Sequence, residues 1–202
     1  QLQPKTTAEY GGGFKPPTRG HFEVVQEALK QNPDIDELII FVGAKEREGV
    51  TQAQSTLIWE IYKKYLPFKV TIEPTSKAPI RAIYDYAKEH PQEEVLWVIG
   101  AREGNEEDFQ DIEKRTRSLR KLAYQNVKVK EIVTGGAVSG TKARQRNDTE
   151  DRSLVYKDFR REVVGKGQRR STCYTSDLDQ IEYVIVKGLV YPAAIIELTR
   201  YD

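Results

Sequence analysis

Cysteine is almost absent from this chain of 202 residues, because Cys173 is the only one. A single cysteine excludes an internal disulfide framework and fits a reducing compartment, so we expect a cytoplasmic protein. Histidine is nearly as rare: only His21 and His90 occur, in unrelated parts of the sequence. Because neither is an obvious partner, we interpret Cys173 as an ordinary thiol rather than a catalytic one.

Long apolar runs are also missing. No segment approaches the roughly 20 consecutive apolar residues that cross a bilayer, and the first residues have neither a secretory nor a transit-like pattern. Charged residues make up 31% and hydrophobic residues 38% of the chain, which is typical of a soluble globular protein without a membrane partner. Methionine is absent too, so we give most weight to motifs within short uninterrupted stretches.

Acidic and basic residues are balanced over the whole chain but separated locally, so one stretch lacks bases and the next almost lacks acids. The formal net charge is +1, yet residues 103–113 contain six acids and no base, and residues 114–146 contain ten lysines or arginines against one acid, Glu131. The basic block could attract a polyanion, either a nucleic acid or a nucleoside triphosphate. For residues 114–121 alone, a solvated helix face is the better explanation.

The sequence does contain a regular alternation of strand and helix patterns. Apolar runs typical of buried strands cover residues 37–43, 68–74, 93–101 and 127–133, and helical patterns cover residues 22–29, 52–65, 106–124 and a stretch after a capping Ser76. This alternation predicts an α/β fold, a Rossmann-like parallel sheet with helices on both faces. The expected first strand, PKTTAEY, is too polar for a central buried strand.

Four glycine-bearing loops, GGGFKPPTRGH, GAKEREG, GAREGN and GGAVSGTK, follow the expected strands. Because the carboxyl ends of parallel strands meet at one edge, we expect these loops to form a pocket there. Residues 1–146 would form this nucleotide-binding domain. Residues 147–202 would be a C-terminal extension, with a charged helix over about residues 151–164 and an apolar run at residues 181–198. This run could be a strand pair or one strand packed on the domain, and it could supply an interface for a homo-oligomer.

The first of these loops has the composition of a phosphate site. Glycines let the backbone approach a ligand closely, an aromatic residue can anchor the loop in the core, and a helix N-terminus favours an anion. A hydroxyl and a ring nitrogen could then bind phosphate oxygens. The residues concerned are Gly12, Gly13, Phe14, Thr18, Gly20 and His21. A capped helix with a surface histidine is the alternative interpretation.

The spacing G-x-F-x-P-x-T-x-G-H, from Gly12 to His21, closely resembles the first signature of the nucleotidyltransferase superfamily, which includes phosphopantetheine, nicotinamide-mononucleotide and glycerol-3-phosphate nucleotidyltransferases. Threonine in place of the first histidine of HxGH is an accepted variant there. VSGTKAR, residues 138–144, resembles the ISxTxxR signature of the same superfamily. Two signatures in the right order, across a β/α pattern, favour a nucleoside triphosphate site.

The resemblance implies transfer of a nucleotidyl group, AMP or CMP, from ATP or CTP to a phosphorylated small-molecule acceptor, with release of pyrophosphate. Mg²⁺ would arrive with the triphosphate, since no dedicated acidic metal site is visible. Thr18 and His21 would contact the α-phosphate region and Lys45 the acceptor phosphate. The β and γ phosphates would be held by Ser139, Thr141, Lys142 and Arg144, and the base and ribose by Gly100 and Arg102. VTQAQS, residues 50–55, stands where many relatives end a motif in Glu-Arg.

Other functions stay open at this point. The chain could be a catalytically silent relative that serves as a binding or assembly module, associated with a virion or with nucleic acid through its basic region. Similar Pro-Pro-Thr-x-Gly-His loops occur in nucleotidyltransferase-like proteins of tailed phages, so a phage origin is one possibility. A class I aminoacyl-tRNA synthetase is a weaker option, because no KMSKS-like loop is present.

Overall fold

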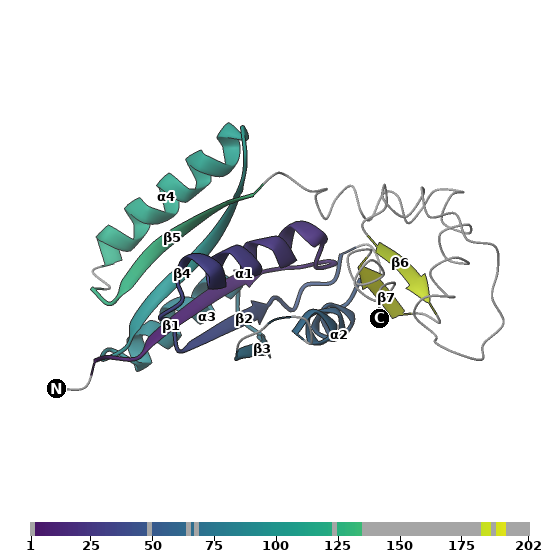
Figure 1. Cartoon of the computed structure of the whole chain (residues 1–202), viewed down its shortest axis with the longest axis horizontal. Coiled ribbons are helices and arrows are strands. Elements are labelled where there is room, and N and C mark those ends of the chain that lie inside the picture. The colour runs from purple at the N-terminus through teal and green to yellow at the C-terminus, as the bar shows by residue number, and fades with distance from the viewer. Residues whose placement is uncertain are drawn as a thin grey trace.

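A computed structural model of the chain describes residues 3–47, 50–63, 66, 69–122, 125–134, 183–186 and 189–192 (Figure 1). Strands and helices alternate through its first 134 residues. The elements are β1 (Thr6–Gly12), α1 (Arg19–Gln31), β2 (Glu37–Val42), α2 (Gln52–Lys63), β3 (Val70–Pro74), α3 (Pro79–Glu89), β4 (Glu94–Arg102), α4 (Glu106–Leu122), β5 (Val127–Thr134), β6 (Tyr183–Val186) and β7 (Leu189–Pro192).

The first five strands form one parallel sheet in the order β3-β2-β1-β4-β5. The strand order reverses beside β1, since the chain first adds strands on one side of it and then crosses to the other. The predicted α/β class, a Rossmann-like parallel sheet with helices on both faces, is therefore confirmed. The four apolar runs predicted as strands correspond to β2, β3, β4 and β5. A topological switch point of this kind is where such sheets bind ligands, beyond the carboxyl ends of the strands.

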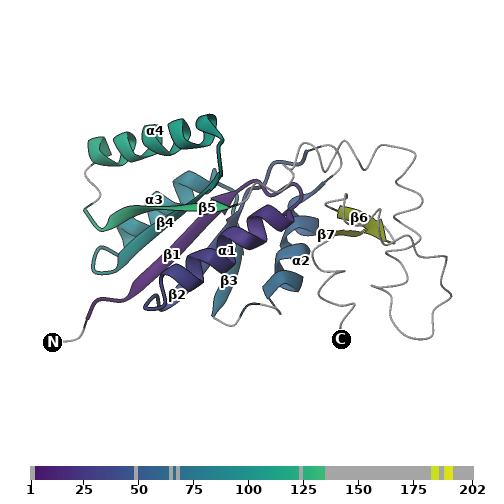
Figure 2. The same cartoon turned by 45° about the horizontal axis from the view of Figure 1, so that its top comes forward.

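Helices cover both faces of the sheet, and each face has its own core (Figure 2). On one face, Val25 of α1 and Trp59 of α2 pack on Ile40 of β2 and the neighbouring strands. On the other face, Ile83 of α3 and Ile112 of α4 pack around Trp97 of β4. Because helices cover both faces, the side chains on both sides of β2 and β4 are buried. This explains why the sequences of these two strands are continuous apolar runs.

The sequence-based view of the first strand was wrong, because the polar segment forms β1 at the centre of the sheet. Ala8 and Tyr10 point into the α1/α2 core, while Thr7 and Glu9 point to the α3 face and are fully buried. Burial, with a smaller contribution from neighbouring carboxylates, raises the pKa of Glu9 to about 9. A neutral carboxylic acid costs far less to bury than a carboxylate, so the strand can hold it.

The helix ends show one further correction. Ser76 does not cap the third helix, because α3 begins at Pro79 with Ala78 as its N-cap residue. Proline suits this first helical position, since its missing N–H would have no partner there in any case. α4 instead has a polar cap, in which the side-chain oxygen of Asn105 accepts the N–H of Asp108 at 3.1 Å.

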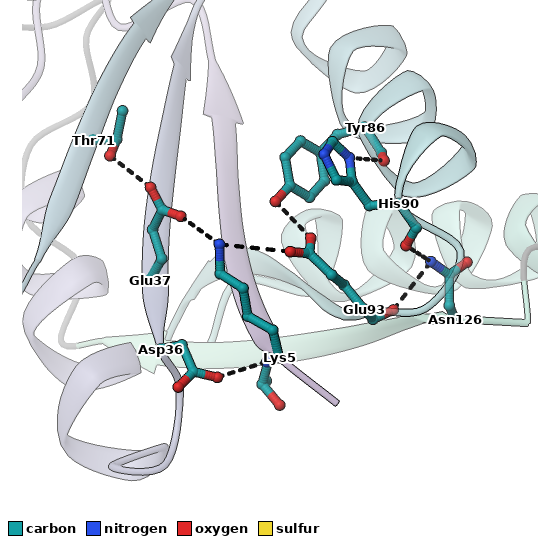
Figure 3. A network of polar contacts seen from close by, with 9 residues as sticks. Lys5, Asp36, Glu37, Thr71, Tyr86, His90, Glu93 and Asn126 are labelled. Carbon is teal, nitrogen blue, oxygen red and sulfur yellow. Dashed lines mark hydrogen bonds and ion pairs between the residues drawn. The ribbon is translucent and has the colours of Figure 1, made fainter. Parts of the chain in front are cut away.

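The amino edge of the sheet carries a network of paired polar groups (Figure 3). Lys5 Nζ donates to Glu37 at 3.0 Å and lies 3.5 Å from a carboxylate oxygen of Glu93. The hydroxyl of Tyr86 donates to Glu93 at 2.6 Å, and that of Thr71 donates to Glu37 at 2.8 Å. His90 lies here too, with its ring stacked on Tyr86.

Two short strands, β6 and β7, form an antiparallel pair in the C-terminal part, so the predicted strand pair is present, and β7 lies against α2. The expected helix over residues 151–164 and the domain boundary at 146/147 lie outside the described residues. None of the helices in the described part of the chain has the length and apolar character needed to cross a bilayer.

Candidate functional site

The loop between β1 and α1 is fixed by Phe14. Its side chain is 6% exposed, and its ring meets those of Tyr10, Trp59 and His21 edge-on at centroid distances of 5.2, 5.1 and 5.0 Å. The backbone of Phe14 has a φ of 50°, a left-handed conformation that is uncommon outside glycine. The loop therefore turns sharply while its aromatic side chain stays in the α1/α2 core, as an anchor would.

The glycines of this loop have different surroundings. A Cβ on Gly12 would stand 2.9 Å from two carbons of the Phe14 ring, so this glycine is required by the packing of the loop itself. A Cβ on Gly13 would meet nothing within 4 Å, and Gly13 is exposed. Gly13 thus offers main chain that a ligand can approach. Gly20 lies in the first turn of α1.

His21 is held in one tautomer. Its Nδ1 accepts the backbone N–H of Thr18 at 2.9 Å and lies 3.2 Å from the Thr18 hydroxyl. Because a backbone N–H can only donate, Nδ1 must be unprotonated, and the proton of the neutral ring is on Nε2. Burial lowers the pKa of His21 to about 4, so the ring stays neutral at physiological pH. His21 can therefore donate one hydrogen bond, from Nε2, to an anion.

Thr18 contacts His21 through both its backbone and its side chain. It is 2% exposed, and both its N–H and its hydroxyl are directed at His21. We expected Thr18 to add a hydroxyl to the ligand. That contact stays a prediction; the geometry adds that Thr18 orients the imidazole at the N-terminus of α1.

Sequence reasoning missed Lys15, which lies in the same loop. Lys15 is 3% exposed, and its Nζ donates to the main-chain oxygen of Gly13 and, at 2.8 Å, to that of Gly43 just after β2. Burial, followed by repulsion from Arg47, lowers the pKa of Lys15 to about 8. The only indication in the sequence that Lys15 is buried was its position between Phe14 and two prolines.

The first turn of α2 also reaches this edge. Gln52 Nε2 donates to the main-chain oxygens of Val42 and Thr75, at 2.9 and 3.0 Å, and the Ser55 hydroxyl donates to that of Phe14. Gln54 and Ser55 stand where relatives place Glu-Arg, and the side-chain oxygen of Gln54 accepts the N–H of Thr51 at 3.0 Å. Gln52 and Ser55 act together. In this chain they bind the ends of β2 and β3 and the loop after β1 to one another.

The remaining candidates divide into three groups. Lys45 follows β2 at this edge and is exposed. Gly100 packs under α1, since a Cβ there would be 2.7 Å from Val24, so close helix packing already explains it. Arg102 forms an ion pair with Asp108 at the start of α4, with Nε–Oδ2 and Nη2–Oδ1 distances of 2.9 and 3.1 Å.

The second signature cannot be placed, because Ser139, Thr141, Lys142 and Arg144 lie outside the described residues. Within the part of the chain that the structure describes, no group of three or more His, Cys, Asp or Glu side chains is arranged to hold a metal ion.

Comparisons with known proteins support the fold at this point. No family model matches the chain, and no curated protein matches its sequence significantly. Two solved structures of the Plasmodium falciparum nicotinic acid mononucleotide adenylyltransferase, one complexed with APC and one with NaAD, are similar, each with a TM-score of 0.50 and 15% sequence identity. The similarity covers 76% and 72% of this chain and 85% of the adenylyltransferase in both cases. The chain therefore shares the fold of this adenylyltransferase over most of its length.

Proposed function

We propose that this protein is a nucleotidyltransferase that transfers a nucleotidyl group from a nucleoside triphosphate to a phosphate-bearing acceptor and releases pyrophosphate. The observation that carries the proposal is the Thr18–His21 pair, which presents a neutral imidazole N–H at the start of α1, beside the switch point of the sheet. The signature resemblance and the two adenylyltransferase neighbours favour the same reaction. Adenylyl transfer from ATP is the first form to test, and cytidylyl transfer from CTP is the second.

The reaction needs no nucleophile from the protein. An oxygen of the acceptor phosphate forms a bond to the α-phosphorus, while the bond from that phosphorus to the bridging oxygen breaks and pyrophosphate leaves with the electron pair. The protein aligns the two anions and stabilises the charge that develops. In this proposal His21 donates to the α/β-phosphate region, the N-terminal amides of α1 bind a phosphate, and Lys45 binds the acceptor.

The second signature would complete the triphosphate site, with Ser139, Thr141, Lys142 and Arg144 at the β and γ phosphates. Mg²⁺ fits as a companion of the triphosphate, held mainly by its oxygens, because the described residues supply no acidic cluster for it. The ion would neutralise charge on the pyrophosphate that leaves.

The test is a thermal-shift titration of the purified protein with ATP, CTP, GTP and UTP, each with Mg²⁺, beside a His21→Ala variant. We expect stabilisation by one triphosphate that is weakened in the variant. That triphosphate is then used to follow pyrophosphate release with candidate acceptors, beginning with nicotinic acid mononucleotide. A folded protein that no triphosphate stabilises at millimolar concentration would contradict the proposal.

A silent binding module is the second candidate, and one observation favours it. Gln54 and Ser55, which replace Glu-Arg, make contacts within the chain, to Thr51 and Phe14, which leaves the usual acceptor contacts unassigned. Stabilisation by a triphosphate, without pyrophosphate release for any phosphorylated acceptor, would support this second reading.

A further inference from the structure

The main chain of Phe14 adopts a conformation that a bulky residue does not favour. Its φ of 50° lies in the left-handed region, where the Cβ atom crowds the backbone. A residue keeps such a conformation only when its surroundings hold it there. Because the Phe14 ring contacts His21, the groups that hold Phe14 also affect the imidazole of the proposed site.

One face of α2 provides this support. The Ser55 hydroxyl donates to the main-chain oxygen of Phe14, although the two residues are 41 positions apart in the chain. Trp59 lies one helical turn further along α2, and its ring meets the Phe14 ring edge-on at a centroid distance of 5.1 Å. Ser55 and Trp59 are both 0% exposed, and a hydrogen bond is stronger in such an interior than in water. α2 therefore holds both the backbone and the ring of Phe14.

The Phe14 ring in turn lies against the imidazole of His21. The two rings meet edge-on, with a centroid distance of 5.0 Å and an angle of 80° between their planes. The backbone N–H of Thr18 holds the same imidazole at Nδ1. A ring held at one nitrogen can still swing about that bond, and the packed Phe14 ring limits the swing. The direction of the Nε2–H bond therefore depends on both contacts.

We propose that Ser55 is a positioning residue of the nucleotidyltransferase site, whose hydroxyl holds the left-handed backbone of Phe14 so that the Phe14 ring fixes the direction of the His21 Nε2–H bond. This inference rests on the proposed function and adds a residue of α2 to a site built on the loop after β1. Ser55 acts through Phe14, because at 0% exposure it is not itself a surface for the ligand.

The experiment is a double-mutant cycle on pyrophosphate release, in which Ser55→Ala and His21→Ala are made separately and together. Alone, Ser55→Ala should lower kcat about tenfold and change the KM for the triphosphate by less than about threefold, because a misdirected donor weakens the transition state more than the ground state. In the His21→Ala background the same substitution should change kcat by less than about twofold, since no imidazole is left to direct.

Thr56→Ala is the matched control. Thr56 is the next residue of α2, and its hydroxyl donates to the main-chain oxygen of Gln52 at 2.8 Å, so this hydrogen bond lies within the helix. The variant loses a hydroxyl and a bond of the same kind as Ser55→Ala does. We expect its kcat to stay within about twofold of the wild-type value in both backgrounds.

The cycle separates a positioning role from a purely structural one. An equal fall in kcat in both backgrounds, an unchanged kcat in Ser55→Ala, or an equal fall in Thr56→Ala would each overturn this inference and leave the proposed function standing. If Ser55→Ala does not fold, Ser55→Cys takes its place, because a thiol is a weaker donor of similar shape, and a smaller loss with the same dependence on His21 is expected. A wild-type protein that releases no pyrophosphate overturns the proposed function and this inference with it.

Discussion

The two edges of the parallel sheet use polar residues in opposite ways. At the amino edge, Lys5, Glu37, Glu93 and Tyr86 bind one another, so each charged group has a partner within the fold. At the carboxyl edge, polar side chains are directed at main-chain oxygens, and among the described residues Lys45 and Arg47 form no ion pair. The amino edge is therefore occupied by its own ion pairs, whereas in the proposed function the carboxyl edge binds the phosphates of the ligand.

The two histidines offer the strongest test of this difference, because one lies at each edge. His21→Ala removes the imidazole donor, and we expect turnover in a pyrophosphate-release assay to fall about 100-fold or more, the scale for one transition-state donor. His90→Ala, on the paired edge, should leave turnover within about twofold. Equal losses in both variants, or near-wild-type turnover of a folded His21→Ala protein, would contradict the assignment of the site to the carboxyl edge.

The buried acid of β1 lies between the two edges and gives the largest expected change in stability. The pKa of Glu9 is raised by folding from 4.5 to about 9, so between these values the unfolded chain releases a proton that the folded chain keeps. Stability therefore falls as pH rises through this window, by about 1.4 kcal/mol per unit. Glu9→Gln cannot ionise, so at pH 7 it should raise the free energy of unfolding by about 2–3 kcal/mol.

Urea denaturation of both proteins at pH 5, 7 and 9 measures this effect. The difference between wild type and Glu9→Gln should grow with pH. Glu37→Gln is the matched control at the amino edge: its pKa is lowered in the folded protein, because hydrogen bonds from Thr71 and Lys5 outweigh the opposing effect of burial. This variant should lose stability, by about 1 kcal/mol at pH 7. A pH-independent difference for Glu9→Gln would show that Glu9 is ionised in the folded protein.

Gly12 and Gly13 separate packing from ligand access within the carboxyl edge. Gly12→Ala places a methyl group against the Phe14 ring, and we expect a loss of about 1–3 kcal/mol in the free energy of unfolding. Gly13→Ala has open space around its methyl group and should change stability by less than about 0.5 kcal/mol while weakening triphosphate binding. Denaturation and calorimetry on the pair measure both quantities; unchanged binding in Gly13→Ala would place the ligand elsewhere.

The smallest effect is expected at the amino edge. Lys5→Met removes the cation between Glu37 and Glu93, but the lysine side chain is 44% exposed, so solvent screens its ion pairs. We expect a loss of about 0.5–1 kcal/mol in stability, which 1 M salt should reduce, and no change in nucleotide affinity. A loss of nucleotide affinity in this variant would remove the distinction between the two edges.

The sequence predicted those parts of the molecule that depend on local pattern. Continuous apolar runs identified β2 and β4, and the loop spacing placed Thr18 and His21 at the start of α1. The central position of β1 could not be predicted, because Glu9 is acceptable there only once folding has made it neutral. The contact between Lys15 and Gly43 was equally hidden, since the two residues are 28 positions apart in the chain and meet only through the pairing of β1 with β2.

The bond from the Thr18 backbone to His21 has a consequence for the pH profile of any activity at this site. A main-chain N–H does not titrate, so Nδ1 remains an acceptor, and Nε2 a donor, until the ring itself is protonated near pH 4. His21 then behaves as a fixed dipole with constant orientation rather than as an acid or a base. Titrating histidines usually produce an inflection in rate profiles between about pH 5 and 8. His21 should produce no inflection in that range.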